Sequence, residues 1–349
     1  MTRACILGCS GTRITDEERA FFAEAQPWGF ILFRRNIESA EQTRALCEEL
    51  RAAAGDDETL VFIDQEGGRV QRARPPVAAN RQPAARFGEL YLRDPDAAIE
   101  AVRLNHRLMA EELRTLGVDA DCAPCVDLLH EDTNAVIGDR SFGGDTDMVA
   151  ALGRAAVDGL LEGGCAPVIK HMPGHGRATA DSHHELPVID TPLAVLEATD
   201  FEPFRALTEA PMAMSAHVVI TAVDPDNAVT VSRHAIETVI RGLIGYDNLL
   251  MTDDLSMGAL GGDLGERTAR AIAAGCDVVC HGNGALVGEH SGDLMAELKA
   301  VAQSAPRLSG RAAERAEAAR AAARRWRPFD MAAAEARLGE WGLAGSLTA

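Results

Sequence analysis

Histidines gather in one short stretch of the chain, KHMPGHGRATADSHHELP, which spans residues 170–187. Pro173 and the neighbouring glycines disfavour regular structure, so the stretch is predicted to be a long loop. Within it, Asp181 precedes His183 by two residues, and an imidazole titrates near neutral pH. A carboxylate at that spacing can orient the ring and raise its basicity. The pair therefore has the chemistry of a group that donates and accepts protons during a reaction.

The same stretch offers a second interpretation, a metal site. His171 and His175 are four residues apart, and in a helix that spacing would place two imidazoles on one face. Pro173 and two glycines disfavour a helix here, so the sequence favours acid/base chemistry. A metal-dependent hydrolase stays open as an alternative, although no cofactor is predicted.

A pair of aspartates follows a second apolar run, in LLMTDDLSMG, residues 249–258. An aspartate at the end of a strand is well placed to act as a nucleophile or a general base. Adjacent residues of a strand point to opposite faces. We therefore expect Asp253 and Asp254 to diverge, with one of them facing the centre of the site.

Two further loops combine acidic and basic side chains. In FIDQEGGRVQR, residues 62–72, Asp64 ends a strand, and a Gly-Gly turn leads to Arg69 and Arg72. Such a loop can bind vicinal hydroxyls or clamp an anion, but it lacks the G-K-[ST] of a phosphate loop. A second turn, IGDRSFG, presents Arg140.

Apolar and amphipathic runs alternate along almost the whole chain. The apolar runs are mostly continuous, as in strands that are covered on both faces. The alternation predicts a parallel sheet with crossover helices, and eight repeats predict a (β/α)8 barrel. An open doubly wound sheet is the alternative, but no G-x-G-x-x-G motif follows a first strand. The expected strands are 4–9, 29–33, 60–65, 119–127, 166–171, 213–219, 248–254 and 277–282, and the expected helices include 39–54, 95–116, 146–163, 192–208, 232–243 and 265–274.

Polar side chains collect where the apolar runs end. In a barrel the carboxyl ends of all strands meet at one face, which carries the active site. Any strand becomes polar as it leaves the core, but that accounts poorly for six such ends. We therefore expect a hydrolase or lyase with an aspartate nucleophile or base, a histidine acid/base and a basic, hydroxyl-binding pocket. The residues concerned are Asp64, Asp127, Lys170 with His171, His217, Asp253 with Asp254, and His281 with Asn283.

Composition limits the class of protein and its partners. The 349 residues carry a formal net charge of −19, which disfavours nucleic acid and anionic membranes as partners. No apolar stretch reaches the roughly 18 residues of a membrane span, and the N-terminus lacks the apolar region of a signal peptide. We therefore expect a cytoplasmic protein, in which the eight cysteines, including Cys122 and Cys125, are buried thiols.

The domain organisation is expected to be simple, because no linker divides the chain. We expect one barrel domain over residues 1–349, with a helical tail at about 309–349. The tail is rich in Ala, Arg and Glu, and it is expected to pack outside the barrel without a chemical role.

Taken together, the motifs resemble family-3 glycoside hydrolases, specifically the branch of single-domain bacterial β-N-acetylglucosaminidases. KH-x-PGHG, D-S-H and TDDL-x-M are the most specific matches. Two positions depart from the family pattern: Met172 replaces a frequent aromatic residue, and Arg177-Ala178 replace a frequent Asp-Thr. The matching segments, in family order, are GFILFRRN (29–36), IDQEGGRVQR (63–72), APCVDL (123–128), GDRSFG (138–143), KHMPGHG (170–176), ADSHHELP (180–187), MSAHV (214–218), MTDDLSM (251–257) and AGCDVV (274–279).

The resemblance implies a role for each candidate residue. Asp253 would be the nucleophile that forms a covalent glycosyl-enzyme, and His183, paired with Asp181, would be the acid/base group. A histidine-aspartate dyad is a variation on the usual pair of carboxylates in glycosidases. The residues that would bind the N-acetylglucosamine unit are Asp64, Arg72, Arg140, Lys170, His171 and Met257.

The resemblance also implies a substrate and a setting. This branch removes terminal N-acetylglucosamine from cytoplasmic peptidoglycan fragments, GlcNAc-1,6-anhydroMurNAc with or without peptide, and chito-oligosaccharides are related substrates. A dyad would repel an anionic acceptor less than a carboxylate would, so phosphate could replace water as the acceptor. Another β-glycoside as substrate, and a sugar-binding protein without activity, stay open as alternatives. The sequence predicts no oligomeric state.

Overall fold

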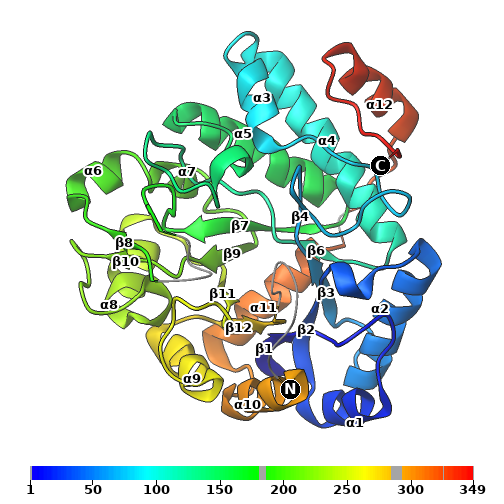
Figure 1. Ribbon diagram of the computed structural model, residues 1–349, viewed down its shortest axis with the longest axis vertical. Coiled ribbons are helices and arrows are strands. Elements are labelled where there is room, and N and C mark those ends of the chain that lie inside the picture. The colour runs from blue at the N-terminus through cyan, green and yellow to red at the C-terminus, as the bar shows by residue number, and fades with distance from the viewer. Residues whose placement is uncertain (1, 181–185, 284–292, 325, 349) are drawn as a thin grey trace.

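The protein forms a closed barrel of eight parallel strands in the computed structural model, which describes residues 2–180, 186–283, 293–324 and 326–348 (Figure 1). Each strand pairs in parallel with its neighbours in the chain, and the last strand pairs with the first. All eight expected strands are confirmed. They are β1 (Arg3–Leu7), β2 (Pro27–Leu32), β3 (Leu60–Ile63), β6 (Ala120–Asp121), β7 (Ala166–Met172), β9 (Met212–Ser215), β11 (Leu249–Asp254) and β12 (Val278–His281).

Helices surround the barrel and bury the outer faces of its strands, which explains why the strands read as continuous apolar runs. A side-chain cap fixes where six of these helices begin, because its oxygen accepts a free backbone N–H of the first turn. The six caps are Thr15, Ser39, Asp94, Asp145, Asp263 and Asp293. The helices that they begin are α1 (Asp16–Ala25), α2 (Ala40–Ala54), α4 (Pro95–Thr115), α5 (Thr146–Glu162), α9 (Leu264–Ala274) and α10 (Leu294–Ser304).

Two expected helices are interrupted. The predicted helix 192–208 consists of α6 (Leu193–Ala198) and α7 (Glu202–Arg205). Between them Asp200 turns inward and is buried, where it accepts hydrogen bonds from His130 and Arg177. The predicted helix 232–243 begins as α8 (Arg233–Ala235) and continues as a π-helix over Ile236–Leu243.

Shorter elements lie in the connections between the barrel strands. A hairpin of β4 (Gln65–Gly67) and β5 (Val70–Gln71) follows β3, and β8 (Val188–Ile189) pairs with β10 (Val219–Ile220). Helix α3 (Ala84–Tyr91) lies before α4, and short 3-10 turns cover Arg34–Asn36, Gly138–Arg140 and Val229–Val231. No helix among the described residues has the length and apolar character needed to cross a membrane.

The C-terminal tail, residues 309–349, packs in two different places, which the sequence did not suggest. Helix α12 (Met331–Glu340) packs outside the barrel on α4, as expected. Helix α11 (Gly310–Ala322) instead lies at the centre of the ring of strands in Figure 1, and its buried alanines join the apolar cluster of the barrel interior. The prediction that the whole tail packs outside is therefore wrong for α11.

Ion pairs show which mouth of the barrel α11 covers. Arg315 pairs with Asp277, which precedes β12, and Arg320 pairs with Asp56, which precedes β3. Both acidic partners lie at amino ends of strands, so α11 closes the amino-terminal mouth. Alanine suits this position because a helix without bulky side chains can approach the strands closely.

All eight cysteines are buried thiols without disulfides, as the sequence predicted. Burial raises the pKa of the Cys122 and Cys125 thiols well above the ordinary value.

Replacing Ala319 by Leu should destabilise the fold, because the residue is fully buried under the barrel. We expect a loss of about 1–3 kcal/mol in the free energy of unfolding, measured by urea denaturation. The matched control is Ala318→Leu, at an exposed position of the same helix, which should change stability by no more than about 0.5 kcal/mol. Equal effects of the two variants would contradict a closing role for α11.

Candidate active site

A pocket opens at the carboxyl ends of the strands, on the side opposite α11. It contains seven of the nine residues that were assigned a catalytic or sugar-binding role from the sequence. The other two, Asp181 and His183, lie outside the described residues. Residues that are far apart in the chain meet here because the strands form a barrel. The pocket is lined by Asp64, Arg69, Val70, Arg72, Val136, Ile137, Arg140, Lys170, His171, His175, Met214, Asp253 and Met257.

Lys170 lies at the centre of the charged wall of this pocket. Its Nζ atom is 3.0 Å from Asp64 Oδ1 and 2.6 Å from Glu66 Oε1, and its side chain is only 2% exposed. Burial alone would lower the pKa of the ammonium group, but the two carboxylates raise it above its ordinary value. Lys170 is therefore a fixed cation at any physiological pH.

The two carboxylates next to Lys170 are each held by an arginine as well. Arg72 Nη2 is 2.9 Å from Asp64 Oδ2, and Arg140 contacts Glu66 through two hydrogen bonds of 2.8 Å. Burial opposes their ionisation, yet the neighbouring cations keep the pKa of Asp64 well below its usual range and lower that of Glu66 to about 2. The wall is thus an alternating series of positive and negative charges.

Sequence reasoning did not single out Glu66. A signal was present, because Glu66 follows Asp64 by two residues, and alternate residues of extended chain point to the same side. The partner of Glu66, Lys170, is more than a hundred residues away in the chain, which is why the pair could not be recognised from spacing.

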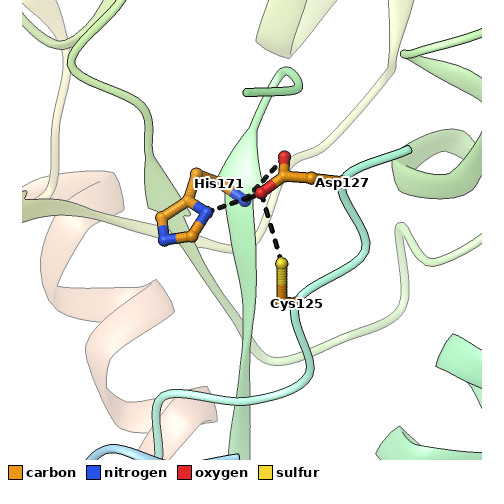
Figure 2. A group of neighbouring side chains, drawn as sticks. All are labelled: Cys125, Asp127 and His171. Atoms are coloured by element: carbon orange, nitrogen blue, oxygen red, sulfur yellow. Dashed lines mark hydrogen bonds and ion pairs between the residues drawn. The ribbon is translucent and has the colours of Figure 1, made fainter. Parts of the chain in front are cut away.

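A second cluster consists of His171, Asp127 and Cys125, with Asp127 bonded to both of the others (Figure 2). Asp127, which is fully buried, accepts a 2.6 Å hydrogen bond from His171 Nδ1, a 2.7 Å bond from the backbone N–H of His175, and one from the Cys125 thiol. Burial opposes ionisation of Asp127, but His171 and these donors hold its pKa well below the usual range. The carboxylate joins the end of β7 to the first turn of the histidine-rich loop.

The contacts of His171 define its tautomer. A carboxylate only accepts hydrogen bonds, so Nδ1 carries the proton that faces Asp127. On the other side, Arg140 Nη2 lies 3.3 Å from Nε2, and a guanidinium only donates. His171 therefore presents an acceptor nitrogen, Nε2, on the side of Arg140.

Cys125, Asp127 and His171 also form the group of described residues whose ligand atoms are close enough together to hold a metal ion. Their spacing fits hydrogen bonding better. Ligands at about 2.0–2.3 Å from a tetrahedral zinc ion lie more than about 3 Å apart, whereas Asp127 Oδ2 and His171 Nδ1 are separated by 2.6 Å. The raised thiol pKa of Cys125 also disfavours the thiolate that a metal requires.

The two aspartates at the end of β11 diverge, as the strand geometry predicted. Asp253 lines the pocket, and its Oδ1 accepts a 2.8 Å hydrogen bond from the backbone N–H of Asp254. The Asp254 carboxylate instead turns toward β12, where it accepts from the backbone of Gly282 and lies 3.4 Å from His281. Of the two carboxylates, only that of Asp253 faces the pocket.

The stem of the histidine-rich loop is anchored by Arg177, one of the two departures from the family pattern. Its Nε donates to Asp200 Oδ2 at 2.6 Å, and the same carboxylate group accepts from His130 Nε2 at 2.9 Å. The other departure, Met172, is a buried core residue. Both positions therefore serve packing next to the pocket, and neither lines it.

The closed barrel and the charged pocket at its carboxyl end define a (β/α)8-barrel enzyme. Residues 4–314 match the family described as Glycosyl hydrolase family 3 N terminal domain. The chain is 40% identical over 282 residues to a beta-hexosaminidase of Xanthomonas euvesicatoria pv. vesicatoria (strain 85-10), across 79% of this chain and 83% of that protein. The chain belongs to glycosyl hydrolase family 3.

Solved structures with this fold agree. NagZ from Neisseria gonorrhoeae in complex with N-trifluoroacetyl-D-glucosamine superimposes with a TM-score of 0.77 at 30% identity, covering 98% of each chain. A family 3 beta-N-acetylglucosaminidase from Paenibacillus sp. str. FPU-7 gives a TM-score of 0.81 at 30% identity, with 92% of this chain matched to 61% of that one. These relatives confirm the resemblance seen in the motifs and the barrel fold that it implied.

Replacing Glu66 by Gln should be strongly destabilising, because it leaves the buried cations Lys170 and Arg140 without a shared counter-charge. We expect a loss of about 3–5 kcal/mol in the free energy of unfolding, measured by urea denaturation. Asp139→Asn is the control, since it breaks an ion pair with Arg69 in which both side chains are about half exposed, and should cost less than about 1 kcal/mol. A Glu66→Gln variant that is as stable as the wild type would contradict the role of Glu66 in a buried charge network.

Proposed function

We propose that the protein is a retaining exo-β-N-acetylglucosaminidase. The observation that carries the proposal is the arrangement of Asp253, a carboxylate at a strand end, facing a pocket whose opposite wall is lined with fixed charges. Asp253 attacks the anomeric carbon and forms a covalent glycosyl-enzyme, which water then hydrolyses. Two displacements at the same carbon retain the β configuration.

The charged wall is suited to sugar hydroxyls. Asp64 is an acceptor that is oriented by Lys170 and Arg72, so it can take hydrogen bonds from two hydroxyl groups without moving. His171 and Arg140 extend this set, and Met257, which is 7% exposed, supplies an apolar contact. These residues hold the terminal sugar.

His175 adds a group that the sequence did not assign to the sugar. It lines the pocket, and both of its ring nitrogens are buried without a hydrogen-bond partner. Burial lowers its pKa to about 4, so the ring is neutral and offers one donor and one acceptor. An unpaired buried polar group costs free energy, and a bound sugar would supply the missing partner.

The acid/base group in this proposal is His183, with Asp181 as its partner. A general acid must carry a proton near neutral pH. Nearby cations and hydrogen bonds hold the pKa values of Asp64, Glu66, Asp127 and Asp254 low, so these carboxylates are ionised at that pH. His175 is neutral and equally unable to donate as an acid. These groups are therefore poor proton donors, which supports a donor from the histidine-rich loop that begins at Lys170, in the pocket lining.

The proposed substrates are peptidoglycan fragments in the cytoplasm, GlcNAc-1,6-anhydroMurNAc with or without peptide. The similarity to beta-hexosaminidases and to NagZ supports the sugar, and the arginines at the pocket rim suit an anionic muramyl lactate or peptide. The whole chain acts as one domain. Another β-glycoside as substrate is the alternative.

Variants of the two proposed catalytic residues should separate this mechanism from metal-dependent hydrolysis. With phenyl β-N-acetylglucosaminide, whose phenol leaves poorly without a general acid, Asp253→Ala and His183→Ala should each lower kcat by at least about a hundredfold, and EDTA should leave the wild type unchanged. Lys299→Gln, which breaks an exposed ion pair with Glu17 outside the pocket lining, is the control. Loss of wild-type activity in EDTA, with recovery on adding zinc, would overturn the proposal.

Phosphate should act as an acceptor for the glycosyl-enzyme, because a histidine dyad repels the anion less than a carboxylate would. Adding inorganic phosphate to the aryl glycoside reaction should produce N-acetylglucosamine 1-phosphate as well as the free sugar, detected by phosphorus NMR. Sulfate at matched ionic strength is the control. Free sugar as the sole product at every phosphate concentration would exclude phosphorolysis.

A further inference from the structure

A buried histidine lies between two carboxylates behind the strand that carries Asp253. His281 ends β12 and its side chain is completely buried. Its Nδ1 is 3.4 Å from Asp254 Oδ1, and its Nε2 is 3.2 Å from Oε2 of Glu297, on helix α10. Nδ1 makes no hydrogen bond among the described residues, so its contact with Asp254 is electrostatic. A neutral imidazole has only one N–H, so only the doubly protonated ring carries positive charge toward both carboxylates.

The surroundings of His281 favour its doubly protonated, positively charged form. Burial lowers the pKa of His281, but Asp254 and Glu297 more than offset this and raise it to about 9. Arg35 is a further cation next to the cluster: its guanidinium donates to the carbonyl oxygen of Gly282 at 2.5 Å. Asn283 donates to Glu297 at 2.7 Å. The cluster therefore contains two carboxylates and one imidazolium, with Arg35 and Asp253 at its edges.

Asp254 connects this cluster to the pocket. Its carboxylate accepts hydrogen bonds from the backbone N–H groups of Gly282 and Ser256, at 3.2 and 2.9 Å. Its own backbone N–H donates to Asp253 Oδ1 at 2.8 Å. The orientation of the Asp254 peptide thus sets the direction of the Asp253 carboxylate, and the side chain of Asp254 fixes that peptide.

We propose that His281, as a cation, is a positioning residue that holds Asp254 and through it orients the nucleophile Asp253, so that deprotonation of His281 slows turnover. The proposal rests on the role of Asp253 given above. His281 touches neither the substrate nor the reacting atoms, and it acts through the backbone of its neighbour strand. Loss of its proton would leave two partly buried carboxylates facing a neutral ring, and their repulsion would loosen the ends of β11 and β12.

The charge also affects stability, and the sign follows from the direction of the shift. A histidine whose pKa is raised from 6.5 to about 9 on folding contributes fully below about pH 6.5. The contribution falls as the pH rises and is lost above about pH 9. The folded protein should therefore become less stable across this interval because of His281.

The kinetic test uses the intact protein and an aryl β-N-acetylglucosaminide with a good leaving group, such as 4-nitrophenol. Departure of that group needs little help from a general acid, so deprotonation of His183 does not mask events at higher pH. For the wild type, kcat should fall around pH 9 while KM changes by no more than about twofold.

Three variants make the test specific. In His281→Asn the amide nitrogen replaces Nδ1 and cannot titrate, so the alkaline fall in kcat should disappear. His281→Ala should lower kcat about tenfold or more at pH 7 with little change in KM. Lys299→Gln is the control on the same helix as Glu297, because it breaks only an exposed ion pair with Glu17, and it should keep the wild-type profile.

The outcomes are distinct. An alkaline fall that persists unchanged in His281→Asn, or a wild-type kcat in His281→Ala, would overturn the positioning role and leave the proposed function intact. A wild type that is inactive on the glycoside would overturn both. Thermal unfolding from pH 6 to 10 provides a second readout, since the loss of Tm over this range should be smaller in His281→Asn than in the wild type.

Discussion

The ammonium group of Lys170, buried between Asp64 and Glu66, is the contact on which the geometry of the pocket depends. Lys170 belongs to β7, whereas its partners come from the end of β3 and the hairpin that follows it, with β6 between them. A buried charge is tolerated only when it is paired and hydrogen-bonded. The lysine therefore specifies how the two loops must lie, because any other arrangement would leave an ion unpaired.

The other charged residues of the pocket wall extend from this contact in two directions. Arg72 extends the series on one side through Asp64, and Arg140 extends it on the other through Glu66. Arg140 then reaches His171, whose opposite nitrogen is fixed by Asp127. The result is one connected network from β3 to the first turn of the histidine-rich loop, so the groups proposed to bind the sugar are oriented before it arrives.

The barrel keeps this network apart from a second set of charges. An apolar cluster fills the interior, and beyond it the arginines of α11 pair with acidic residues at the amino ends of the strands. The first set of charges orients groups around a pocket, whereas the second fastens a helix over the opposite mouth. In this fold, the carboxyl ends of the strands are expected to carry the active site, and the amino ends are expected to contribute stability.

The sequence predicted the barrel well and the partners of its charged residues poorly, for physical reasons. Continuous apolar runs are a local property, so all eight strands could be located. The gap between α6 and α7 depends on Asp200 binding His130 and Arg177, which lie 70 and 23 residues away. The pair Lys170 with Glu66 forms only when β3, β6 and β7 lie side by side, and the pair His281 with Glu297 forms only when α10 packs next to the end of β12. Spacing in the chain carries no record of either contact.

The geometry of a β-strand explains why two adjacent aspartates can differ in role. Strand alternation directs Asp253 into the pocket and Asp254 toward β12, where His281 and backbone N–H groups keep it ionised. A carboxylate held in that way cannot serve as the proton donor that a glycosidase needs as its second group. The cations that hold Asp64 and Glu66 have the same effect on them. Because so many carboxylates are fixed as anions, they are poorly suited to donate a proton, and this is the physical reason for proposing His183 in that role.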